Sequence, residues 1–208
     1  MTPQVRDSER LQEILSVFYA GRTSRDETRS AVIDVVLGRL QCARVSLWKF
    51  NGDGDDLTLL CFASKSAGGA LDTSDRRLHR VEYRDYFNAL IERGTYLSVD
   101  AMNDPALQPM RDNYLVPNNV LSMLDAAFLL NGRAYGVICC DETATSRHWR
   151  ASDVAALRAI VTKLALMMSG APESALWTTP SVALRAMPLS PATPDPAPPP
   201  RPPDDRRG

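Results

Sequence analysis

Two apolar runs joined by Asn131-Gly132 constrain the fold of this chain more than any other feature. Asn-Gly between two strand-like runs is the strongest short-range signal for a β-hairpin. The first arm, from Leu121 to Leu130, is mostly apolar on both of its alternating faces. Such a strand is typical of the middle of a sheet that is covered on both sides. The segment 120–142 therefore predicts a central hairpin.

Two residues of this hairpin depart from its apolar pattern. Gly136, in the second arm, indicates a bulge or a place where another group packs close to the backbone. Asp125 puts a carboxylate in the middle of a strand that should be buried, so it needs a partner or a ligand. Either it accepts hydrogen bonds from a ligand in a pocket, or backbone N–H groups, an arginine or Trp149 satisfy it internally.

Hydrophobic periodicity and turn residues predict the remaining elements. Ser24 and Glu27 form a capping box at the start of a helix, and Gly94 and Pro117 are stop signals. The expected elements are helices at 8–21 and 24–40, strands at 43–50 and 57–64, a loop at 65–80, a helix at 81–93, a strand at 95–99, a short helix at 104–117, the hairpin, and a helix at 152–169. This order predicts an α+β fold with a mainly antiparallel sheet.

The C-terminal segment has a different composition from the rest of the chain. Residues 171–208 hold 11 of the 15 prolines. Such a segment offers too little apolar surface to offset the entropy of ordering, so we expect it to be disordered with polyproline character. We therefore divide the chain into an N-terminal helix at 1–23, a single domain at 24–170 and a proline-rich tail at 171–208.

Charge and hydropathy restrict the partners and the cellular compartment that we expect for the protein. The net charge of −1 gives no bulk attraction to nucleic acid or acidic membranes. The N-terminus lacks the apolar core of a signal peptide, and Arg158 and Lys163 interrupt the best candidate for a membrane span. We expect a soluble, cytoplasmic protein with no nucleic-acid or membrane partner.

The four cysteines have no CxxC spacing and lie in apolar runs, which is typical of reduced core thiols. Cys139 and Cys140 are adjacent on a strand, so they point to opposite faces and cannot readily pair with each other. A redox enzyme using Cys61, Cys139 or Cys140 would need an exposed thiolate of lowered pKa, which an apolar strand disfavours. The sequence also lacks a phosphate-cradling glycine loop and a Gly-x-Ser-x-Gly elbow.

His79 and His148 are the only imidazoles. No cluster of His, Cys and Asp has metal-ligand spacing, so we expect no metal site. His79 alone is a credible haem ligand, and the sequence leaves the cofactor unknown.

Three stretches together resemble a GAF domain, the small-molecule sensing module of signalling proteins. They are Arg44–Phe50 with the glycine-rich turn after it, Tyr83–Leu90 leading to Asp104-Pro105, and Ser122–Asp125 with Gly136–Glu142 and Arg147-His-Trp149. The resemblance covers about residues 24–169 and is greatest to the GAF domains that precede histidine kinases and diguanylate cyclases. It implies a five- or six-stranded antiparallel sheet, with the N- and C-terminal helices on one face and a ligand pocket on the other, beneath residues 71–117.

The resemblance also restricts the ligand. The signature of GAF domains that bind cyclic nucleotides is missing, and no cysteine lies between Leu71 and Val120 to attach a bilin or reduce methionine sulfoxide. The aromatic residues Tyr83, Tyr86, Phe87 and Tyr114 within this segment either stack on a planar ligand or only pack the core. Asp100 is also suited to a turn, together with Asn103. The ligand-binding candidates are Tyr83, Tyr86, Phe87, Asp100, Met102, Tyr114, Met123 and Asp125.

We therefore expect a non-catalytic sensory or regulatory module that binds a small molecule and signals through its terminal helices to a partner protein. Leu11, Ile14, Leu15 and Phe18 form an apolar stripe, which we expect to pack against a second copy in a homodimer. The alternative is a protein-interaction adaptor with a closed pocket, whose segment 196–203 docks to a partner that reads polyproline helices. An inert, solvated tail is equally consistent with that composition.

Overall fold

The structure is a computed structural model, and it describes residues 2–130, 133–169 and 176–177, all within one compact unit, Met1–Thr178. Helices, strands and short turns follow each other in the predicted α+β order. The elements are α1 (Pro3–Tyr19), α2 (Arg25–Leu40), β1 (Arg44–Asn51), η1 (Gly54–Asp56), β2 (Thr58–Ser66), β3 (Arg76–His79), α3 (Arg84–Arg93), β4 (Thr95–Ser98), η2 (Pro105–Met110), η3 (Arg111–Leu115), β5 (Ser122–Leu130), β6 (Arg133–Glu142) and α4 (Ala151–Met168).

The six strands form one antiparallel sheet in the order β3-β2-β1-β6-β5-β4. The predicted hairpin supplies two inner strands, β5 and β6, and both are covered on two sides because both of their faces are mostly apolar. Its turn residues, Asn131-Gly132, lie outside the described residues. The prediction of a central, doubly covered hairpin is confirmed by the two strands.

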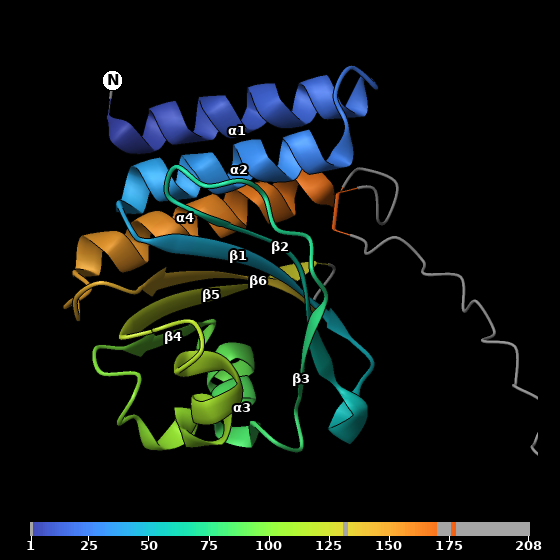
Figure 1. The fold of residues 1–208 in the computed structure, drawn as a ribbon. Helices are drawn as coiled ribbons and strands as arrows, with labels where there is room; N and C mark the ends of the chain where they lie inside the picture. Colours follow the sequence, from blue (N-terminus) through green and yellow to red (C-terminus); the bar gives the residue numbers. More distant parts are fainter. Residues whose placement is uncertain (1, 131–132, 170–175, 178–208) are drawn as a thin grey trace, which may run out of the picture. The chain divides into compact units, whose positions relative to one another are not determined.

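The terminal helices share one face of the sheet and α3 lies on the other (Figure 1). On the helical face, α2 contacts β1 and β2, α4 contacts β5, and α1 contacts α2 and α4. The apolar residues on this face form one core, which we call the helix-side core, and those on the opposite face form a second, the α3-side core. Cys140 belongs to the first and Cys139 to the second, which confirms that these neighbours point to opposite faces.

Local signals explain where the helices begin and end. The Ser24 hydroxyl accepts from the Glu27 N–H, and the Glu27 carboxylate accepts from the Ser24 N–H at 2.9 Å, so the capping box is confirmed. Gly94 ends α3 in the left-handed conformation, with φ of 70°.

Two segments differ from the expected elements. Residues 76–79, expected to be loop, form the edge strand β3, which pairs with β2 over only four residues. Its sequence, Arg-Arg-Leu-His, shows no run long enough for periodicity to detect. The piece after Asp104 is not an α-helix but a 3₁₀ turn followed by a π turn, with Pro109 interrupting it.

The apolar stripe of α1 packs inside its own chain. Leu11, Ile14 and Leu15 are buried in the helix-side core, and Phe18 is half-buried against it. The inference that this stripe forms a dimer surface is therefore wrong, because α2 and α4 of the same chain already cover it. No helix in the described part of the chain is both long and apolar enough to cross a membrane.

Candidate functional site

The carboxyl of Asp125 lies in the α3-side core. Asp125 follows Met123 on the same face of β5 and is fully buried. The Tyr86 hydroxyl of α3 donates to its Oδ2 at 2.7 Å, and the same hydroxyl lies 3.8 Å from the Cys139 sulfur on β6. Trp149, one of the internal partners considered from the sequence, belongs to the opposite core. The partner of Asp125 is therefore a tyrosine from the helix that covers this face.

The two oxygens of Asp125 differ in their hydrogen bonds. Its Oδ1 is buried and has no partner at ordinary hydrogen-bond geometry among the described residues, although the Cys139 thiol and the Cys140 N–H also interact with the carboxyl and lower its pKa. Burial, with a further contribution from the charge of Asp141, raises the pKa of Asp125 to about 8. At neutral pH the group is therefore mostly a neutral carboxyl, with a proton to donate from the core.

A second buried carboxylate, Asp141, lies on the neighbouring strand. Arg44 at the start of β1 donates to its Oδ2 from Nε at 3.0 Å and from Nη2 at 2.8 Å. The Tyr114 hydroxyl of η3 donates to the same oxygen at 3.1 Å, and Arg44 also donates to Asn118 at 2.7 Å. This network fastens the segment that covers the α3-side core to the sheet.

Most of the predicted ligand-binding residues meet in this one core. Tyr83, Tyr86, Phe87, Tyr114, Met123 and Asp125 are buried there, and the half-buried Met102 packs against it. The rings of Tyr86 and Phe87 meet edge to face at a centroid separation of 6.2 Å. In the structure as it stands these side chains fill the space between sheet and α3.

Asp100 lies apart from that core. It is exposed beyond the end of β4, where its carboxylate accepts from the Asn103 amide at 2.8 Å, as the turn reading of these two residues predicts. Asp104 caps the following turn through the Ala106 N–H at 3.1 Å. A shallow groove of about 360 Å³ follows this edge of the sheet; its lining residues are Leu97, Ser98, Val99, Asp100, Asn103, Asp104 and Pro105.

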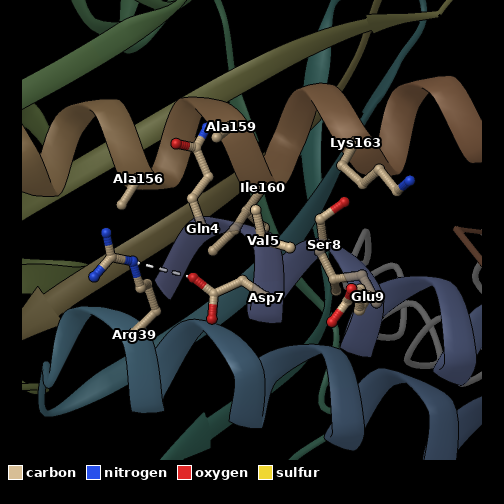
Figure 2. Close-up of a pocket in the computed structure, with 11 residues that line it drawn as sticks. Gln4, Val5, Asp7, Ser8, Glu9, Arg39, Ala156, Ala159, Ile160 and Lys163 are labelled. Carbon is tan, nitrogen blue, oxygen red and sulfur yellow. Dashed lines mark ion pairs between the residues drawn. The ribbon is translucent and has the colours of Figure 1, made fainter. Parts of the chain in front are cut away.

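A different cavity, of about 320 Å³, opens on the helical side (Figure 2). Val5 and Gln4 of α1 point toward Ala159 and Ile160 of α4 across it, as Figure 2 shows. An ion pair between Asp7 and Arg39, at 3.1 Å, lies along its α2 side. The cavity lies between the terminal helices, and none of the predicted ligand-binding residues lines it.

The metal and thiol alternatives gain no support from the geometry. His79 and His148 are exposed, and the described residues hold no group of three or more His, Cys, Asp or Glu side chains that could bind a metal ion. All four cysteines are buried and free. Burial raises the pKa of the Cys61, Cys139 and Cys140 thiols, the reverse of what a reactive thiolate needs.

Reasoning from the sequence missed Arg44, Asp141 and Trp177 as parts of this architecture. The sequence contained a signal for the first two. On β6, Asp141 follows Val137 and Cys139 at every second position, and on β1, Arg44 precedes Ser46 and Trp48 in the same way. Both residues therefore lie on the strand face that borders the α3-side core. For Trp177 no local pattern was recognised, and its ring and N–H contacts with the described residues are to partners distant in sequence.

The comparisons with known proteins agree with this fold. The family model "GAF domain" matches residues 24–168. Structural similarity extends to the blue-light absorbing form of the Thermosynechococcus elongatus PixJ GAF domain, with a TM-score of 0.58, 16% identity, and coverage of 70% of this chain and 84% of that one. It extends also to the GAF domain/HD domain protein from Geobacter sulfurreducens, with a TM-score of 0.56, 15% identity, and coverage of 71% and 93%.

A third similar structure is the phycoerythrobilin-bound GAF domain from a cyanobacterial phytochrome, with a TM-score of 0.61 and 16% identity, over 78% of this chain and 94% of that one. The comparison with curated proteins gives no match. At these identities the similar structures show the fold, and the family model identifies the sequence. The chain belongs to the GAF domain family.

Proposed function

We propose that this protein is a non-catalytic sensory module that binds a small molecule in the α3-side core and signals to a partner protein. The observation that carries the proposal is the unsatisfied Oδ1 of Asp125, which is fully buried among aromatic side chains. An unpaired polar atom in a core costs about 1–3 kcal/mol, so a hydrogen bond from a ligand to this oxygen would be favourable. A ligand that reaches this oxygen removes the cost.

The cover of this core is suited to open. Residues 105–115 consist of a 3₁₀ turn and a π turn instead of a regular helix. Such turns have poorer hydrogen-bond geometry and often lie at functional hinges. Tyr114 and its bond to Asp141 fasten this cover on one side, and the Asn113 amide donates to the Tyr83 hydroxyl at 2.9 Å on another. Breaking these bonds and withdrawing the buried side chains of Leu107, Met110 and Leu115 would admit a ligand beside Asp125.

The surface of the terminal helices supports a homodimer as the signalling form. Leu166 on α4 is 68% exposed, and Val5 and Tyr19 on α1 are also exposed large apolar residues. Val5 also lines the cavity between α1 and α4. A second copy that covers these residues would bring the terminal helices of two subunits together, in place of the buried stripe considered from the sequence.

A thermal-shift screen of a small-molecule library on the full chain tests the proposal. A ligand that raises the melting temperature of the wild type should have little effect on Asp125→Ala. Its effect on Asp100→Ala should be normal, because Asp100 is exposed outside the core. A ligand that stabilises all three proteins equally binds elsewhere, and such a result would contradict the proposed site.

A second candidate is the protein-interaction adaptor, which the closed state of the α3-side core favours. Tyr83, Tyr86 and Phe87 are all almost completely buried, so the core is already packed without a ligand. In that case the proline-rich segment 196–203, which lies outside the described residues, would be the docking strip. Deleting residues 179–208, which keeps the buried Leu176 and Trp177, should abolish partner binding for an adaptor and leave small-molecule binding intact for a sensor.

A further inference from the structure

Trp177 closes the helix-side core from a position beyond the last helix. It follows the C-terminal end of α4 by nine residues in sequence and is completely buried. Its ring lies edge to face against Phe62 and Phe128, with centroid separations of 5.2 and 5.1 Å. Its indole N–H donates to the backbone carbonyl of Trp48 at 2.9 Å. One hydrogen bond and two aromatic contacts therefore hold the side chain of Trp177 in place.

Two irregularities of the sheet shape the slot that receives this ring. Leu47 pairs with Ala63 and Trp48 with Cys61, which leaves Phe62 without a partner in register. As a result Phe62 faces the helix-side core together with its neighbour Ala63. The second irregularity lies in the hairpin, where Phe128 pairs with Gly136 but Leu129 with Ala134, so that Tyr135 is the extra residue.

Gly136 gives the slot its depth. A Cβ at this position would lie 2.4 Å from Nε1 of Trp177 and 2.7 Å from the ring of Phe128. Only glycine leaves room for both rings, which confirms the prediction that another group packs close to the backbone here. The phenylalanines and the missing side chain thus form a site that fits an indole.

A buried arginine holds the residue next to Trp177. Arg29 of α2 donates from Nε to the Leu176 carbonyl at 3.0 Å, and its guanidinium lies 4.6 Å above the Phe62 ring. The side chain of Arg29 is only 2% exposed. Among the described residues, the hydrogen bonds to Leu176 and from Trp177 are accepted by backbone carbonyls, that of Leu176 and that of Trp48 on the sheet.

Trp48 connects this slot to the opposite face of the sheet. Its carbonyl accepts from Trp177, whereas its side chain belongs to the α3-side core. There its indole donates to Ser46 at 2.7 Å, and its ring lies edge to face against Tyr114, 6.2 Å between centroids. Tyr114 in turn belongs to the segment that covers the core. One residue thus contacts both the cover and the docked tryptophan.

We propose that the slot formed by Phe62, Phe128 and Gly136 is a reversible docking site for the side chain of Trp177, and that Trp48 couples its occupancy to the cover of the α3-side core. In the docked state Trp177 is held by Phe62, Phe128 and the carbonyl of Trp48. In the released state these three contacts are lost. Movement of Tyr114 shifts Trp48 and favours release.

This inference takes from the proposed function only one element, namely that the ligand binds in the α3-side core. Hydrogen–deuterium exchange of the full chain without ligand tests it. Trp177→Phe keeps a ring in the slot but loses the bond to Trp48, so exchange in residues 105–115 should rise about fivefold or more, the lower range of typical site-to-site couplings. Trp149→Phe, at another buried tryptophan of the helix-side core, is the control and should leave that segment unchanged.

Because coupling between two sites is reciprocal, loosening the cover should in turn loosen the docked tryptophan. Tyr114→Phe should raise exchange around residues 176–177 by a similar factor. Tyr83→Phe, which loses a bond to Asn113 but does not involve Trp48, should not. The proposal is overturned if either Trp177→Phe or Tyr114→Phe has no effect on the distant segment, or if the controls match them. Failure to find a ligand would leave this result unchanged, so the two proposals fail separately.

Discussion

The hydroxyl of Tyr86 donates to the carboxyl of Asp125 at 2.7 Å, and both groups are buried between the sheet and α3. This bond joins the covering helix to a central strand through two polar groups in an apolar core. It satisfies one oxygen of the carboxyl and leaves the other without a partner among the described residues. The polar chemistry of the α3-side core therefore centres on a group that is neutral or charged according to pH.

The stability of the protein should depend on pH through Asp125. Its pKa is about 8 when folded, against an ordinary value of 3.8, so between these values the folded state keeps a proton that the unfolded state has lost. The contribution of Asp125 to the free energy of unfolding is therefore fully present below about pH 4. Between about pH 4 and pH 8 it falls by about 1.4 kcal/mol per pH unit. Urea unfolding of the wild type and Asp125→Asn across this range measures the effect. Parallel curves for the two proteins would contradict the raised pKa.

Removing Arg44 should be much more costly than removing a surface arginine. Arg44→Met leaves the buried Asp141 without its ion pair, and breaking such a pair typically costs about 3–5 kcal/mol. Arg10→Met is the matched control, because the Arg10–Glu13 pair is largely exposed and should contribute little. Denaturant unfolding of both variants checks the difference. Equal losses would mean that the Arg44–Asp141 contact does not stabilise the fold.

A methyl group at position 136 should disturb the docked tryptophan. Gly136→Ala overpacks the slot and should destabilise the protein by about 1–3 kcal/mol. Adding Trp177→Ala removes one of the two clashes, so the double variant should lose less than the sum of the single variants. A double-mutant cycle on unfolding free energies measures this coupling. Strict additivity would show that Gly136 and Trp177 do not share the slot.

The proposed dimer should depend on exposed residues of α4 and not on the buried stripe of α1. Leu166→Glu should yield monomers while changing the stability of the monomer fold by no more than about 0.5 kcal/mol. Leu15→Ala, at a fully buried position, should destabilise the fold by about 2–5 kcal/mol without preventing association. Sedimentation velocity distinguishes the variants, and a Leu166→Glu protein that still sediments as a dimer would rule out this interface.

The thiols should react only when the protein opens. Burial raises the pKa of Cys61, Cys139 and Cys140, so each remains a protonated thiol inside the core. Iodoacetamide under native conditions should label these three slowly, and rapidly once urea unfolds the chain. Mass spectrometry of peptides after timed labelling provides the measurement. Rapid labelling of one cysteine in the native protein would revive the redox alternative.

Sequence reasoning succeeded where a local pattern decides the structure. A few neighbouring residues were enough to recognise the alternation in 121–130, the capping box of Ser24 and the unusual Gly136. Each of these features appears in the structure as expected. The failures involve distant partners. Strand β3 exists because β2 offers it an edge, and the stripe of α1 is covered by helices that its own sequence does not specify.

The candidate site shows the same division. An aspartate in a strand that should be buried identified Asp125 from the sequence alone, because a carboxylate conflicts with an apolar strand. That its partner is Tyr86 depends on how α3 packs across the sheet, which periodicity does not determine. The sequence also could not show that the aromatic candidates already fill the core, because side-chain packing depends on the distances between elements.

Native mass spectrometry of the freshly purified wild type and Asp125→Asn, incubated with the small-molecule fraction of a cell extract, tests the central claim most directly. We predict a mass above that of the polypeptide in the wild type, lost on denaturation and strongly reduced in Asp125→Asn. A wild type that carries only its own mass under these conditions, or an adduct that persists unchanged in Asp125→Asn, would contradict ligand binding at Asp125.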